Sequence, residues 1–106
     1  MTITTQPEPV HLGRAATALE AVLAGGPDMG LDDATTLAVV GALATLDDVH
    51  PPYPPRPEPT QPLPADEGIA LALDELAQAI THADTVERAV LAGLAARELR
   101  RLDARR

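Results

Sequence analysis

A dense run of prolines near the middle of the chain most constrains its fold. Eight of the eleven prolines lie between Pro51 and Pro64. Proline lacks a backbone N–H and pushes the preceding residue out of the helical region, so no α-helix can pass through this stretch. The run separates two Ala- and Leu-rich segments, and the residue spacing of each segment indicates a pair of helices.

The composition limits the size and content of the core. With 106 residues, the chain has room for one domain. Hydrophobic residues make up 45% of it, which is too many for a disordered chain, yet it contains no Phe or Trp and a single Tyr. Leu, Val, Ile and Ala must therefore fill a thin aliphatic core, and self-association would relieve the shortage of buried surface.

The first segment predicts two helices with clear boundaries. From Val10 to Ala24, apolar residues recur at three- and four-residue spacing. Gly25-Gly26-Pro27 then predicts a left-handed cap and a stop. The second helix is expected to begin near Leu31, with Asp32 or Asp33 capping its free N–H groups.

The middle of the second helix predicts contact with a partner. Residues 34–46 carry no charge, so we expect this helix to be buried on nearly all sides. A domain of four helices would leave some of that apolar surface uncovered, which favours a partner. Ala38, Gly41 and Ala42 belong to a row of small side chains that would let another helix approach closely.

The second segment predicts two further helices. The third is expected to open at Pro64 or Ala65, where proline is well tolerated. Its apolar stripe consists of Ile69, Leu73, Leu76, Ile80 and Ala83. The fourth is expected to start at Asp84, whose spacing to Glu87 fits a capping box.

The elements together predict an all-α fold: a four-helix bundle made of two helical hairpins joined by a proline-rich crossover. We expect a flexible tail at residues 1–9 and a single helical domain at 10–106. Its hairpins would occupy residues 10–49 and 65–106, with a polyproline connector at 50–64. About fourteen residues at ~3.1 Å each can run the length of a helix, so the third helix can start at the opposite end of the bundle.

The proline run also contains a candidate recognition motif. Pro51, Pro54 and Arg56 satisfy the pattern PxxPxR, and a preformed polyproline helix loses little entropy when it docks in an aromatic groove. So many prolines produce this spacing automatically. A stiff connector is therefore the favoured interpretation.

Charge is distributed unevenly along the chain. Residues 1–84 hold thirteen acids and two arginines, net −11, and residues 85–106 hold three acids and six arginines, net +3, which gives the overall −8. The arginines singled out at the C-terminus are Arg97, Arg100, Arg101 and Arg105. Cations stabilise a helix C-terminus, and Arg also binds acidic proteins and phosphates. The acidic body disfavours nucleic acid as the main partner.

The sequence offers little for catalysis or metal binding. It has no Cys, which excludes disulfides, thiol catalysis and Cys-ligated zinc. His11, His50 and His82 lie far apart, and none has a second ligand at helical spacing. Adjacent acids on a helix do not face each other, so the acidic pairs are not expected to act as acid–base dyads. We expect no enzyme, metal, cofactor or small-molecule substrate.

The expected function is therefore protein–protein interaction. No signal peptide is evident in residues 1–9, and no uncharged apolar stretch reaches the ~18 residues that span a bilayer, which predicts a soluble cytoplasmic protein. The favoured hypothesis is a non-enzymatic adaptor or scaffold that forms a homodimer or binds a protein partner. Two alternatives remain: an accessory DNA-associated regulator using the Arg-rich C-terminal helix, and an acidic antitoxin- or inhibitor-like protein that binds a basic partner.

Overall fold

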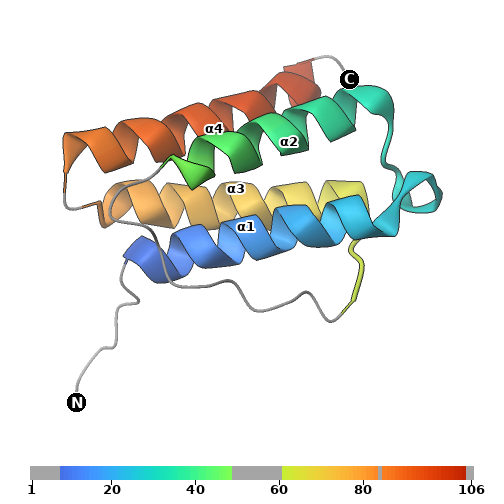
Figure 1. Cartoon of the computed structure of the whole chain (residues 1–106), viewed down its shortest axis with the longest axis horizontal. Helices are drawn as coiled ribbons and strands as arrows, with labels where there is room; N and C mark the ends of the chain where they lie inside the picture. The colour runs from blue at the N-terminus through green and yellow to red at the C-terminus, as the bar shows by residue number, and fades with distance from the viewer. Residues whose placement is uncertain (1–7, 49–60, 84, 105–106) are drawn as a thin grey trace.

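In a computed structural model, residues 8–48, 61–83 and 85–104 are described, and they form four α-helices and no β-strand (Figure 1). The helices are α1 (Glu8–Gly25), α2 (Asp33–Asp47), α3 (Ala65–Thr81) and α4 (Val86–Ala104). A short 3₁₀ helix, η1 (Pro27–Met29), lies between α1 and α2. The prediction of an all-α fold is confirmed.

The four helices pack against one another as two layers (Figure 1). α1 packs most extensively on α3, and α2 packs on α4. α3 also contacts α4, whereas the contact between α1 and α2 is smaller. The closest pair, α1 with α3, therefore joins helices from different halves of the chain.

Glycines and an aspartate shape the junction between α1 and α2. Gly26, in the predicted stop, has φ +66°, and Gly30, which the sequence analysis did not single out, has φ +91° and is the left-handed residue. Asp32 Oδ1 accepts the backbone N–H of Thr35 at 2.7 Å and so caps α2. These residues reverse the direction of the chain over a short distance, and the N-terminus of α2 is capped.

The core consists of aliphatic side chains from all four helices. Its largest fully buried hydrophobic members are Leu12, Leu19, Val22, Val39, Leu46, Leu76 and Leu99. Alanines fill the spaces between them, and many are fully buried. Because these side chains are short, the helices must approach one another closely for the core to close.

α1 and α3 approach each other closely at Gly68. A Cβ atom there would collide with Val22 Cγ2 and would lie 3.4 Å from the carbonyl oxygen of Ala18. Just before α3, Leu63 donates its backbone N–H to the carbonyl oxygen of Ala21 at 3.1 Å. This hydrogen bond ties the start of α3 to the C-terminal half of α1.

The structure corrects the expectation that α2 is buried on nearly all sides. Val39 and Leu46 are fully buried and Leu43 is half-buried, but Leu37 is 75% exposed and Val40 is 50% exposed. The physical reason is that α2 packs mainly on α4 and less on α1. Its opposite face has no neighbour among the described residues.

The buried face of α3 also differs from the predicted stripe. Ile69 and Leu76 are buried as expected, and Leu73 is half-buried. Ile80 is 38% exposed, because the last turns of α3 bury Ala79 instead.

The start of α4 lies one residue later than the capping box predicted. Thr85 Oγ1 accepts the backbone N–H of Arg88 at 3.2 Å, which is the geometry of an N-cap at Thr85. α4 then begins at Val86. Asp84, the cap expected from sequence, lies outside the described residues.

We predict that Gly68→Ala destabilises the protein although alanine favours helices. The added methyl group collides with Val22, whose β-branched side chain is stiff, and overpacking of this kind costs ~1–3 kcal/mol against a helix-propensity gain of ~1 kcal/mol. Urea denaturation should give a lower free energy of unfolding.

Gly13→Ala is the matched control, because it adds the same methyl group to α1 at a position with nothing within 4 Å. This variant should be more stable than wild type by ~0.5–1 kcal/mol. An equal gain at Gly68 would show that α1 and α3 do not approach as closely as described.

Candidate interaction surface

The outward faces of α2 and α4 carry most of the exposed large hydrophobic side chains that the structure describes. On α2 these are Leu37 and Val40, and on α4 they are Val86 (80% exposed), Val90 (51%) and Leu94 (44%). The only other exposed large hydrophobic side chains among the described residues are Leu71 and Ile80 of α3. We call the residues Leu37, Val40, Val86, Val90 and Leu94 the α2/α4 face.

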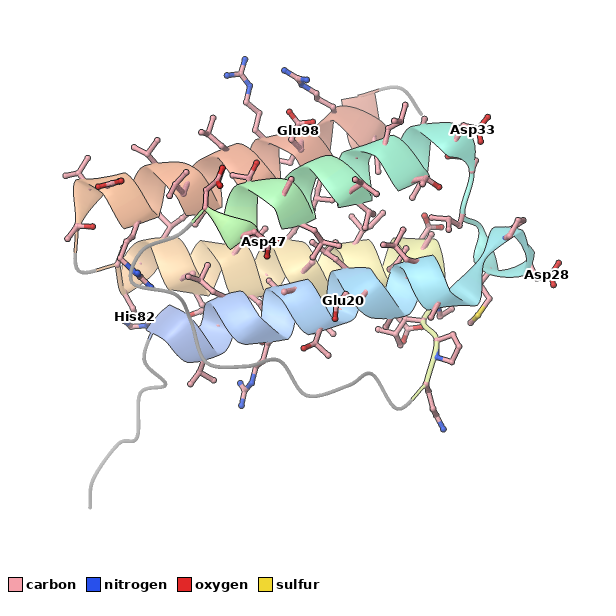
Figure 2. All side chains as sticks on the ribbon, viewed as in Figure 1. Glu20, Asp28, Asp33, Asp47, His82 and Glu98 are labelled. Carbon is pink, nitrogen blue, oxygen red and sulfur yellow. The ribbon has the colours of Figure 1, made fainter. Side chains whose placement is uncertain are left out.

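The α2/α4 face belongs to two helices that lie side by side. Glu98 of α4 reaches toward α2, and its Oε2 would lie 3.5 Å from a Cβ atom added to Gly41 (Figure 2). Val40 is next to Gly41 in sequence, and Leu94 is one turn before Glu98. The exposed apolar residues therefore lie on two neighbouring helices.

Two of the predicted small contact residues are covered by this chain itself. Ala38 and Ala42 are buried in the core, at 8% and 0% exposure. Gly41 lies at the edge, beside Glu98. A partner would meet the larger apolar residues of the α2/α4 face in place of Ala38 and Ala42.

The described arginines near the C-terminus point into solvent. Arg97, Arg100 and Arg101 are exposed. Arg101 Nη1 forms an i, i+3 ion pair with Glu98 Oε1 at 3.3 Å. Arg105 and the motif residues Pro51, Pro54 and Arg56 lie outside the described residues, so the predictions about them stand as predictions.

A polar cluster that sequence analysis missed lies between α1 and α3. His11 donates its Nδ1–H to Glu75 Oε2 at 2.7 Å, and both side chains are largely buried. The ring of His82, which follows α3, stacks on His11 with centroids 5.9 Å apart and an interplanar angle of 13° (Figure 2). Since 64 residues separate His11 from Glu75, no local pattern could reveal the pair.

The cluster explains how a histidine can be buried in this core. A buried imidazole without a hydrogen-bond partner would lose its solvation without compensation, and the Glu75 carboxylate supplies that partner. The stacked ring of His82 covers one face of His11. The His11–Glu75 pair is therefore a polar contact between α1 and α3 in which each side chain has a hydrogen-bond partner.

A second group that sequence analysis missed is the buried arginine of α4. Arg88 is 5% exposed, whereas the other described arginines of α4 are exposed. It lies one turn after Thr85, at the end of the protein where α3 gives way to α4. A buried guanidinium needs hydrogen-bond acceptors inside the protein. Arg88 is therefore part of the interior and does not contribute to the basic surface near the C-terminus.

Several threonine hydroxyl groups are engaged with the backbone. Thr17, Thr36, Thr45 and Thr81 each donate their Oγ1–H to the carbonyl oxygen four residues earlier, at 2.8–3.0 Å. Such bonds are the usual way for a hydroxyl group to be satisfied within a helix.

The described residues contain no group of three His, Cys, Asp or Glu side chains placed to hold a metal ion. No described helix combines the length and apolar character of a membrane span. In comparisons with known proteins, no family model, no curated protein and no solved structure matches this chain.

We predict that Glu75→Ala lowers the free energy of unfolding by ~1–3 kcal/mol, because it leaves His11 buried without its acceptor. Glu75→Gln, which keeps an acceptor oxygen of similar shape, should cost less. Urea denaturation of both variants measures the difference.

Asp74→Ala serves as the control, since Asp74 is the exposed neighbour of Glu75 on the same helix. Its effect should stay within about 0.5 kcal/mol of wild type. Equal losses for Glu75→Ala and Asp74→Ala would rule out a stabilising role for the His11 contact.

Proposed function

We propose that this chain is a non-enzymatic interaction protein that self-associates through the α2/α4 face. The observation that carries the proposal is the concentration of exposed large hydrophobic residues on two adjacent helices. Single exposed apolar side chains are common on any protein, but their grouping on one face is typical of interaction surfaces. A second helical layer against this face would remove these residues from water.

The thin core supports self-association. Residues such as Val39 and Leu46 use the inner face of α2, while Leu37 and Val40 remain outside. A small domain buries a small share of its surface, so a second copy adds buried apolar area that one chain cannot supply. Closed, two-fold symmetric dimers are the commonest assemblies of this kind.

The polar interior supports a non-enzymatic role. Glu75 is paired with His11, and the four threonines described above bond their own helices. Glu75 thus joins α3 to α1, and the four threonine hydroxyl groups are satisfied within their own helices. An interaction surface requires no further chemistry.

The proline-rich connector fits the same proposal as a crossover between two helical hairpins of a bundle. The end of α2 and the start of α3 lie at opposite ends of the packed helices (Figure 1). Leu63, near the end of the connector, hydrogen-bonds to Ala21 of α1. The positions of these two described ends support a connector that crosses from one end of the bundle to the other.

We predict that Leu94→Ser weakens self-association at least about 10-fold, because a two-fold interface loses the side chain from both subunits. Size-exclusion chromatography with light scattering over a concentration series gives the dissociation constant. The wild-type chain should be a dimer at tens of micromolar.

Leu71→Ser is a closely matched control. Leu71 of α3 is 45% exposed, against 44% for Leu94, but lies outside the α2/α4 face. Its replacement should leave the dissociation constant unchanged while costing similar folding stability. A wild-type chain that remains monomeric at these concentrations would refute the proposal.

A further inference from the structure

One row of residues on the outward face of α4 has the spacing of a coiled-coil seam. The positions alternate three and four residues apart, and all are exposed: Glu87, Val90, Leu94, Arg97 and Arg101. We call this row the α4 seam. Residues spaced in this way line up along one side of a helix, and these fourteen steps cover ~21 Å.

The α4 seam is asymmetric in charge. An acid occupies its N-terminal end, two apolar residues its middle and two arginines its C-terminal end. Glu87 and Arg97 form no ion pair with any described residue, whereas Arg101 already pairs with Glu98. The charges of Glu87 and Arg97 are therefore available to another chain.

We propose that a second copy of this chain docks on the α4 seam in antiparallel orientation. This inference rests on the proposed function and specifies its register. With the two-fold axis between Val90 and Leu94, Val90 packs on the partner's Leu94, and Leu94 packs on the partner's Val90. Glu87 then faces the partner's Arg97, and the symmetry repeats this pair at the other end.

Other pairings of the outward helix faces bring like charges together. A parallel α4 pair sets Glu87 against the partner's Glu87. The corresponding row of α2 has Asp33 near one end and Asp47 near the other, and α2 carries no basic residue (Figure 2). An antiparallel α2 pair therefore opposes acid to acid, which is destabilising.

Mixed pairings of α2 with α4 are also less favourable. In antiparallel orientation, Asp33 can meet the partner's Arg101, but Asp47 then meets the partner's Glu87. In parallel orientation, Asp33 meets the partner's Glu87. Among the registers compared above, the antiparallel α4 pair is the one in which both end contacts are attractive.

The test uses two single substitutions in the full chain, Glu87→Arg and Arg97→Glu. Each places like charges at both symmetric contacts, so each variant alone should self-associate at least about 10-fold more weakly than wild type. Mixed in equal amounts, one chain presents Arg at both positions and the other presents Glu. Sedimentation should then show a heterodimer within about 3-fold of wild-type affinity.

A second pair of variants controls for overall charge. Glu67→Arg and Arg100→Glu change the net charge of the chain by the same amounts at exposed positions outside the seam. Each should dimerise with the affinity of wild type, and mixing the two should not raise that affinity. Since Glu87 lies in the first turn of α4, where an acid favours the helix dipole, urea denaturation must confirm that Glu87→Arg is folded. Should it not fold, Glu87→Gln replaces it and should still weaken self-association.

The outcomes separate the register from the proposed function. If wild type dimerises and Leu94→Ser weakens the dimer, but the mixture of charge variants gains nothing, the antiparallel register is wrong and the proposed function stands. A monomeric wild type overturns both. A third outcome also overturns the seam and favours a DNA-associated role. In it, the wild type binds duplex DNA in a salt-dependent way and Arg97→Glu loses this binding, while the molar mass in solution, and so the state of self-association, is the same for both.

Discussion

The close packing of α1 on α3 supports the rest of this structure. Without Phe or Trp, the core side chains are short, so helices must approach closely before these side chains meet. Gly68 permits that approach because it places no Cβ against Val22 and the backbone of Ala18. The apolar side of α1, including Leu12 and Leu19, is fully buried as a result.

α2 and α4 carry apolar residues on the face that packs in the core and also on the face that points outward. Their inner faces bury Val39, Leu46 and Leu99, and their outer faces expose Leu37 and Val90. Four short helices cannot surround each other, so a surface of this kind remains wherever a helix is apolar on more than one side. The proposed self-association would cover that surface, and the charges along α4 favour one orientation of the proposed dimer.

Local signals predicted the helices well. The stop at Gly26 and the cap at Asp32 each act within a few residues, so their effect can be read from neighbouring sequence. The boundaries of α1, α2 and α3 agree with these signals to within about two residues. The cap of α4 was predicted one residue too early, at Asp84, because Asp84 and Thr85 both have the chemistry of a cap and only the backbone position decides between them.

Contacts across the chain could not be predicted in the same way. Periodicity indicates which direction around a helix is apolar, but it does not say which helix will lie there. Sequence alone therefore established four helices, their aliphatic inner faces and the uncharged middle of α2, residues 34–46. Tertiary packing decided that His11 meets Glu75, that Arg88 is buried, and that Leu37 and Val40 stay in water, because those outcomes depend on which helices become neighbours.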